Sequence, residues 1–193
     1  MAYLQEYFDF VTDAIRLEFF QPNGLSMFEL GNQCVTTGST FKTGKEHFTN
    51  LGISHTSVDL NGLNLALPLD LRKPELFNEF SNKFDILTNM GTTEHVEPIS
   101  KQYECFSIIH SVVREGGIMI HMVPDVKELD VSGAWHRHCS LYYSEEFFLN
   151  LAAMCNYTVL ENKVIFGLRS VCMRKETSPF NASRELFNLI QHR

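Results

Sequence analysis

The stretch that decides the fold is Leu25-Ser-Met-Phe-Glu-Leu-Gly31. It is a short apolar run, it follows the turn signal Pro22-Asn-Gly24, and it closes on a glycine. Such a run is typical of a buried strand that leads into a tight turn. Gly31 permits a backbone conformation or a close approach that a side chain would obstruct. We therefore predict a buried strand whose carboxyl end opens into a turn.

Apolar residues upstream of this strand recur at spacings of three and four. They are Leu4, Phe8, Val11, Ile15 and Phe19, which predicts an amphipathic helix over residues 3–20. Downstream, short apolar runs alternate with helical patterns. The strands are expected at 55–59, 65–69, 84–89 and 118–123. The helices are expected at 74–81, 98–114 and 144–154, with a short helical stretch through Phe48 and Leu51. This alternation predicts an α/β protein, doubly wound, with a mostly parallel sheet covered on both faces.

The C-terminal part departs from this alternation. Residues 157–166 and 169–174 are strand-like and straddle Gly167, so they predict an antiparallel pair and an antiparallel C-terminal edge strand. A tail helix is expected within 178–193. Because domains commonly run to about 100–200 residues, we expect residues 1–193 to form a single domain with its core at 25–175.

Composition excludes several classes of protein. The chain has 193 residues, 44% of them hydrophobic, and a formal net charge of −7, so neither disorder nor a general attraction to nucleic acid or an anionic membrane is expected. Five scattered cysteines argue against a disulfide framework or a zinc ribbon. The sequence lacks both an export signal and a run of ~18 apolar residues. We therefore expect a cytoplasmic protein.

Polar residues stand where the predicted strands end. Glu29 and Gly31 close the first strand, Asp59 the second, Asp70 the third and Asn89 the fourth. Ligands of open parallel sheets bind beyond the carboxyl ends of the strands, and a carboxylate there can accept hydrogen bonds from a ribose diol. Together these residues predict a crevice of nucleoside size.

The same series of segments resembles the class I S-adenosylmethionine-dependent methyltransferases, which have a Rossmann-like fold. The resemblance covers roughly residues 20–175 and rests on Phe28-Glu-Leu-Gly31, Ser57-Val-Asp59, Leu69-Asp70-Leu71, Phe84-Asp-Ile-Leu-Thr-Asn89 and Arg114-Glu-Gly-Gly117-Ile-Met-Ile. It implies S-adenosyl-L-methionine as the cofactor. The implied cofactor-binding residues are Glu29, Gly31, Asn32, Asp59, Leu60, Asp70, Leu71, Asn89 and Met90.

The resemblance also implies which part of the cofactor each residue meets. Glu29, Gly31 and Asn89 would lie by its methionine part, Asp59 would hold the ribose hydroxyls, and Leu60, Asp70 and Leu71 would contact the adenine. One feature departs from the family, because Asn32-Gln33 stands where further glycines are usual. Glu29 and Asp59 are also 30 positions apart, more than the ~20 of a tight nucleotide loop. An inserted loop at 33–43 explains this spacing.

Glu94 and His95 follow the strand at 84–89 and are the candidate catalytic residues. Histidine titrates near neutrality, so His95 can take a proton from an acceptor as a methyl group arrives. In the alternative, His95 packs against the cofactor or caps a helix. His136 and His138 are expected in a loop beside the active site; no metal site is expected, since a third ligand is missing nearby in the sequence.

These features predict an S-adenosylmethionine-dependent methyltransferase acting on a small-molecule or pendant O/N acceptor. The acceptor would be held by the N-terminal helix, the 90–98 loop and the 125–143 segment, with no role for nucleic acid or membrane. A nicotinamide-dependent enzyme would need Gly-x-Gly-x-x-Gly after the first strand, and the chain lacks it. The alternative is a catalytically inactive methyltransferase-like protein that serves in binding or assembly.

Overall fold

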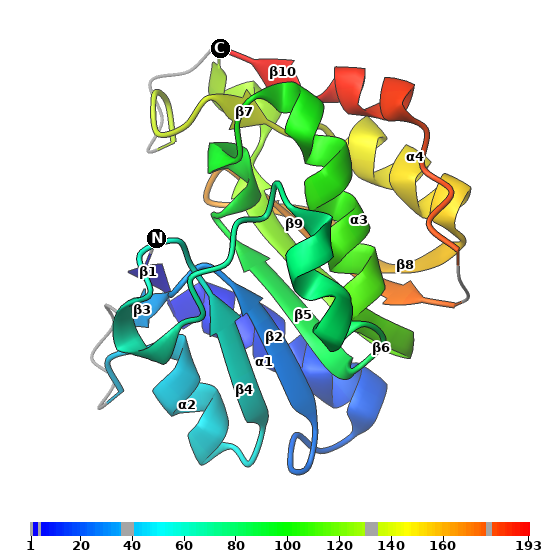
Figure 1. The fold of residues 1–193 in the computed structure, drawn as a ribbon. Coiled ribbons are helices and arrows are strands. Elements are labelled where there is room, and N and C mark those ends of the chain that lie inside the picture. Colours follow the sequence, from blue (N-terminus) through cyan, green and yellow to red (C-terminus); the bar gives the residue numbers. More distant parts are fainter. Residues whose placement is uncertain (1, 4, 36–40, 130–134, 177–178) are drawn as a thin grey trace.

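The computed structural model describes residues 2–3, 5–35, 41–129, 135–176 and 179–193. Its centre is a six-stranded sheet (Figure 1). In spatial order the strands are β4 (Ser54–Val58), β2 (Ser26–Leu30), β5 (Phe84–Met90), β6 (Val113–Pro124), β9 (Leu168–Lys175) and β8 (Tyr157–Ile165). The first four are parallel, and β9 is antiparallel to both β6 and β8. The predicted fold class is confirmed, and the reversed strand is β9, one place in from the edge.

Helices cover both faces of the sheet. On one face, α1 (Gln5–Phe19) and α2 (Gly44–Asn50) bury a cluster that includes Met27 of β2. On the other, α3 (Gln102–Val112), α4 (Glu145–Cys155) and the 3-10 helix η2 (Pro74–Phe80) pack on a cluster that includes Phe28. Successive side chains of a strand point to opposite faces, so one apolar run supplies both layers.

Two small strand pairs and several 3-10 turns complete the chain. β1 (Ala2–Tyr3) pairs in parallel with β3 (Cys34–Val35), and β7 (Leu141–Tyr142) pairs antiparallel with β10 (Gln191–His192). The remaining turns are η1 (Leu63–Leu65), η3 (Thr93–His95), η4 (Ile99–Lys101), η5 (Val126–Leu129) and η6 (Arg184–Leu189). The β1–β3 pair adds a short piece of sheet where the predicted inserted loop begins.

The inserted loop leaves β2 and returns to the same place. Gln33 O accepts from Gly44 N at 3.0 Å, and Val35 N donates to Lys42 O at 2.9 Å. Residues 36–40, including Gly38, lie outside the described part of the chain. Gly44 begins α2, so the ends of the insertion match the expected 33–43 boundaries.

The strand predicted at 65–69 is wrong. Asn64 and Leu65 have positive φ values of 51° and 64°, and Pro68 has no N–H to donate. Only Leu67 meets the sheet, donating to Ser57 O at 2.8 Å and accepting from Asp59 N at 3.0 Å. Backbone conformation therefore limits this segment to one bridge beside β4.

The helix predicted within 178–193 is found, but it is shorter than that range and is a 3-10 helix. The described residues form the 3-10 helix η6, capped by the Ser183 hydroxyl at Leu186 N, followed by the short strand β10. Ile190 already has an extended backbone, with φ −74° and ψ 125°. Pairing of β10 with β7 takes the last residues out of the helix.

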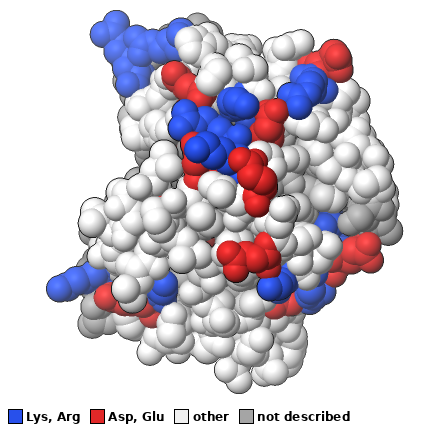
Figure 2. Space-filling view, viewed as in Figure 1, with Lys and Arg blue, Asp and Glu red and all other residues white. Residues whose placement is uncertain are grey.

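Within the described part of the chain, no helix combines the length and apolar character needed to cross a membrane. All five cysteines are free thiols, as the sequence led us to expect. Acidic and basic side chains are interspersed over the face seen in Figure 2.

Candidate active site

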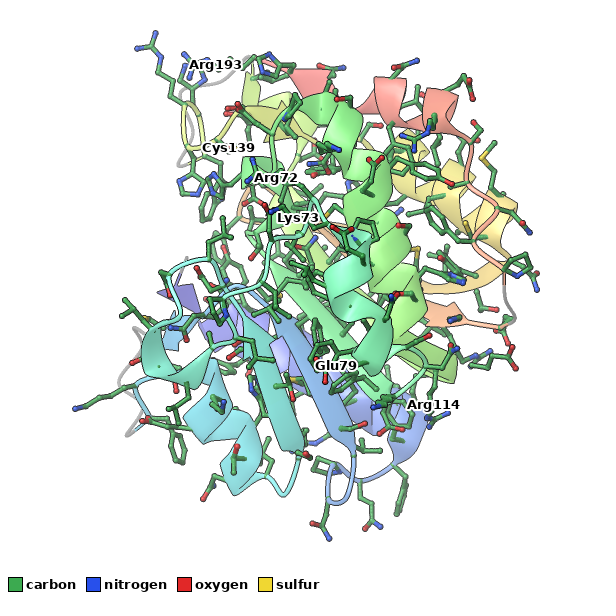
Figure 3. The ribbon with its side chains drawn as sticks, in the orientation of Figure 1. Arg72, Lys73, Glu79, Arg114, Cys139 and Arg193 are labelled. Atoms are coloured by element: carbon green, nitrogen blue, oxygen red, sulfur yellow. The ribbon has the colours of Figure 1, made fainter. Side chains whose placement is uncertain are left out.

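A cavity of about 350 Å³ opens at the carboxyl ends of β2, β4 and β5. Arg72 and Cys139 lie at this end of the molecule and Arg114 lies at the other (Figure 3). The volume of the cavity is within the range of small-molecule sites, about 300–1,000 Å³. Six of the nine predicted cofactor residues border it, from three separate loops: Gly31, Asn32, Asp59, Leu60, Asp70 and Leu71.

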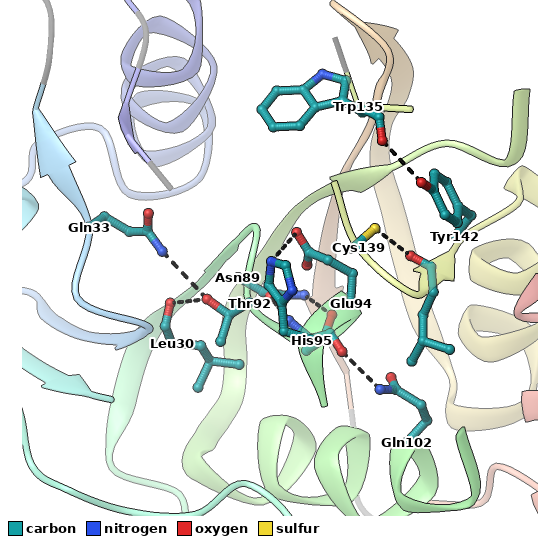
Figure 4. A network of polar contacts seen from close by, with 12 residues as sticks. Leu30, Gln33, Asn89, Thr92, Glu94, His95, Gln102, Trp135, Cys139 and Tyr142 are labelled. Atoms are coloured by element: carbon teal, nitrogen blue, oxygen red, sulfur yellow. Dashed lines mark hydrogen bonds and ion pairs between the residues drawn. The ribbon is translucent and has the colours of Figure 1, made fainter. Parts of the chain in front are cut away.

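Gly31 forms the closest approach between two of these loops. Its φ is +80°, and a Cβ on it would lie 2.5 Å from Thr92 Oγ1 and 2.6 Å from Gln33 Nε2. Thr92 Oγ1 in turn donates to Leu30 O at 2.8 Å and accepts from Gln33 Nε2 at 3.4 Å (Figure 4). The turn after β2 and the turn after β5 thus meet where only glycine fits.

Asp59 both borders the cavity and organises it. Its carboxylate accepts from Asn32 N at 3.1 Å and from Asn61 N at 3.0 Å, while Asn32 Nδ2 donates to Leu63 O at 2.9 Å. A carboxylate offers about four lone-pair sites. Acceptor capacity is therefore left over for a ligand after the two loop contacts.

Asp70 is held by a neighbour that the sequence analysis did not single out. Arg72 donates to both oxygens, from Nε at 2.9 Å and from Nη2 at 2.8 Å, and its backbone N–H donates to Oδ1 at 3.0 Å. These bonds lower the pKa of Asp70 to about 2. Arg72 also borders the cavity, so a ligand here meets a fixed ion pair and not an isolated carboxylate.

Glu29 does not border the cavity. It lies between Phe28 and Leu30 on β2, so its side chain points to the opposite face, where Oε2 is 3.6 Å from His55 Nε2. Both side chains are buried, and burial lowers the pKa of His55 to about 4. Glu29 therefore sits behind the first loop of the site, in the layer of α1 and α2.

Asn89 and Met90 also lie behind the cavity. Asn89 Nδ2 donates to Thr93 Oγ1 at 2.9 Å and lies 3.1 Å from His121 Nδ1, and Asn89 Oδ1 accepts from Thr93 N at 3.2 Å. Met90 is buried in the cluster under α1 and α2. These residues fix the turn after β5 from inside, while Thr92 supplies its cavity surface.

The two candidate catalytic residues have different surroundings. His95 borders the cavity with a side chain that is 49% exposed, whereas Glu94 is fully buried and its Oε1 lies 3.9 Å from His95 Nε2 (Figure 4). His138 also borders the cavity, with its ring centroid 5.2 Å from that of His95. Burial raises the pKa of Glu94 to about 8 and lowers the pKa values of His95 and His138.

Sequence reasoning missed several residues that border the cavity. Gln33, Arg72 and Thr92 were not singled out, although each stands within three positions of a predicted residue. A usable signal existed for Thr92, since a short polar side chain after a strand commonly bonds nearby backbone, as Thr92 does at Leu30 O. The placement of His138 beside the active site was expected and is found.

Comparison with solved structures shows which proteins share this fold. The chain is similar to the 1,6-didemethyltoxoflavin-N1-methyltransferase of Burkholderia thailandensis, a structure with bound 1,6-didemethyltoxoflavin and S-adenosylhomocysteine. The TM-score is 0.58 at 15% identity, over 86% of this chain and 76% of that one. It is also similar to the geranyl diphosphate C-methyltransferase of Streptomyces coelicolor, with TM-score 0.54 at 10% identity, over 89% and 82% of the two chains.

A protein of Pyrococcus horikoshii matches over a larger share of both chains, 90% and 92%, with TM-score 0.57 and 12% identity. No family model matches the sequence, and no curated protein matches it. At these identities the likeness is one of fold. The chain thus has the fold of the class I S-adenosylmethionine-dependent methyltransferases.

Proposed function

We propose that this protein binds S-adenosyl-L-methionine in the cavity and transfers its methyl group to a small-molecule or pendant O/N acceptor. The observation that carries the proposal is the convergence of Gly31, Asp59 and Asp70 on one cavity from three separate loops. A fold shared with methyltransferases supports the same assignment.

The residues that border the cavity suit the parts of that cofactor. Asp59 retains acceptor capacity for ribose hydroxyls, and Leu60 and Leu71 offer apolar surface for the adenine. Gly31 lets the turn after β2 approach Thr92 closely, so that its backbone borders the cavity. Asp70 would accept from the adenine amine only in competition with Arg72. Glu29, Asn89 and Met90 would support these loops from behind and not touch the cofactor.

Methyl transfer requires the protein mainly to align the methyl donor with the acceptor. The bound cofactor supplies a methyl group already activated by its sulfonium, so the chain must hold donor and acceptor in line and exclude water. His95 is the proposed catalytic residue, because it borders the cavity and its neutral imidazole can accept a proton from an acceptor hydroxyl or amine. Glu94 is buried next to His95 and does not border the cavity, so it would support His95 without touching the acceptor.

The test is calorimetric titration of the full chain with S-adenosylhomocysteine. We expect one binding site per chain and a rise in melting temperature, because a ligand that binds only the folded state stabilises it. Absence of both heat and thermal shift would contradict the proposal and favour an inactive binding or assembly protein. Binding without turnover on any acceptor would support the inactive alternative while keeping the cofactor site.

A second measurement addresses His95. If His95 accepts the proton, His95→Ala lowers turnover by about 10²–10⁴-fold and leaves the affinity for S-adenosylhomocysteine near that of the wild type. Turnover equal to the wild type would return His95 to a packing role. The control is His192→Ala, which removes an exposed histidine near the C-terminus.

A further inference from the structure

The carboxyl group of Glu94 lacks a hydrogen-bond partner in the part of the chain that the structure describes. It is fully buried, and neither of its carboxylate oxygens has a hydrogen-bond donor within the described residues. A buried carboxyl group without a donor costs free energy, and such groups in folded proteins generally have a partner. The side chain lies immediately behind the cavity wall, next to His95.

Two imidazoles complete a set of ligand atoms around this carboxylate. One ligand atom each from Glu94, His95 and His138 lies within 4.8 Å of the others. Glu94 and His95 belong to η3, and His138 comes from the turn after Trp135, so the cluster joins two distant parts of the chain. An ion bound at about 2.0–2.2 Å from each ligand requires these atoms to move closer together, which the exposed side chains of His95 and His138 allow.

The surrounding contacts hold the three ligands in place. Gln102 Nε2 donates to Thr93 O at 2.8 Å and to Val96 O at 2.7 Å, which fixes the turn that carries Glu94 and His95. The Trp135 ring packs edge-on against His138, with centroids 5.0 Å apart. These contacts limit the movement of the turn after Thr92 and of the His138 ring.

We propose that Glu94, His95 and His138 bind a divalent first-row transition-metal ion, with Zn²⁺ as the reference ion. Two imidazoles and one carboxylate are the donor set of catalytic zinc sites and of the facial triad of non-haem iron. Mg²⁺ and Ca²⁺ prefer sites made of oxygen ligands, so this cluster disfavours them. No metal site was expected from the sequence, because no third ligand lies near His136 and His138 along the chain. The fold brings His138 next to Glu94 and His95, which are distant in sequence.

Three protein ligands leave at least one coordination position open, and His95 and His138 both border the cavity. An acceptor hydroxyl that bound there would be oriented and made more acidic by the ion. While the ion is bound His95 is a ligand, so it can serve as the proton acceptor proposed above only in the metal-free protein. The role of the ion in orienting an acceptor rests on the proposed function. Binding of the ion itself does not, since it requires no cofactor and no turnover.

The experiment titrates metal-stripped full-length protein with Zn²⁺ by calorimetry, and with Co²⁺ by visible absorption. We expect one ion per chain. Glu94→Gln and His138→Ala should each weaken Zn²⁺ binding at least ~100-fold, since even outer partners of metal ligands are worth about 10–100-fold. His136→Ala is the matched control, because this histidine lies on the same turn but bonds Glu128 O through Nδ1. It should bind as the wild type does.

Three results would overturn the proposal: no binding by the wild type, equal affinity in Glu94→Gln and His138→Ala, or preference for Mg²⁺ over Zn²⁺. His138 is exposed, so its variant is expected to fold even if Glu94→Gln does not. Titration of each variant with S-adenosylhomocysteine separates the two proposals. If the wild type binds Zn²⁺ but not S-adenosylhomocysteine, only the methyltransferase function is contradicted. If it binds S-adenosylhomocysteine but not Zn²⁺, only the metal site is contradicted.

Discussion

Asp59 shows how one side chain can serve both the fold and the ligand. It accepts backbone hydrogen bonds from Asn32 and Asn61, which belong to two different turns, and it borders the cavity itself. The sequence predicted its position at a strand end. Its two loop contacts followed only from the structure, because the donors belong to turns whose conformation depends on Gly31 and Asn61.

Asp59→Ala should therefore weaken binding of S-adenosylhomocysteine by about 10–100-fold, which corresponds to about 1–3 kcal/mol for a buried hydrogen-bonding group. Calorimetric titration measures it. Asp13→Ala is the matched control, since Asp13 is exposed on α1. Affinity equal to the wild type in Asp59→Ala would remove Asp59 from the cofactor site.

The start of α4 was predicted well because a capping residue marks it, whereas the helix predicted at 98–114 ends at Val112 and β6 runs through the Gly116-Gly117 pair that was expected to stop it. Ser144 stands before α4, and its hydroxyl accepts from Phe147 N at 3.0 Å, so the helix begins where the sequence indicated. The segment at 65–69 has no such marker, and its apolar composition alone suggested a strand. Left-handed backbone at Asn64 and Leu65 decided otherwise.

Ser144→Ala should lower the free energy of unfolding by about 1 kcal/mol, because it leaves an N–H of the first turn of α4 without its acceptor. Urea unfolding measures the change. Ser107→Ala removes a hydroxyl that only donates to Glu104 O inside α3, so it should change stability by less than about 0.5 kcal/mol. Equal losses in the two variants would show that the cap contributes nothing specific.

Across the whole molecule, three buried histidines link stability to pH. Burial lowers the pKa values of His55, His110 and His121 to about 4, 4 and 3, from an ordinary value of 6.5. Below pH 6.5 the unfolded chain binds protons at these sites and the folded chain does not, so their contribution to stability is lost as the pH falls. The buried Glu94, whose pKa is raised, acts in the opposite sense.

Comparison of variants isolates one histidine. Between pH 7 and pH 5 the wild type should lose about 2 kcal/mol more stability than His110→Gln, because 1.5 pH units below 6.5 correspond to about 2 kcal/mol. Glutamine retains a polar atom for the Tyr157 hydroxyl, which lies 2.7 Å from His110 Nδ1. Urea unfolding at the two pH values provides the measurement, and identical pH dependence in the two proteins would contradict it.

The sequence by itself determined most of the order of strands and helices, and it placed Gly31 and Asp59 at strand ends and Asp70 after the segment that bridges to β4. It did so because hydrophobic periodicity and turn chemistry act over a few neighbouring residues. Tertiary structure decided which side chains face the cavity: it turned Glu29 and Asn89 behind the wall and brought Arg72 onto Asp70. It also carried His138 to Glu94, because contacts between distant segments depend on how the whole sheet and its loops pack.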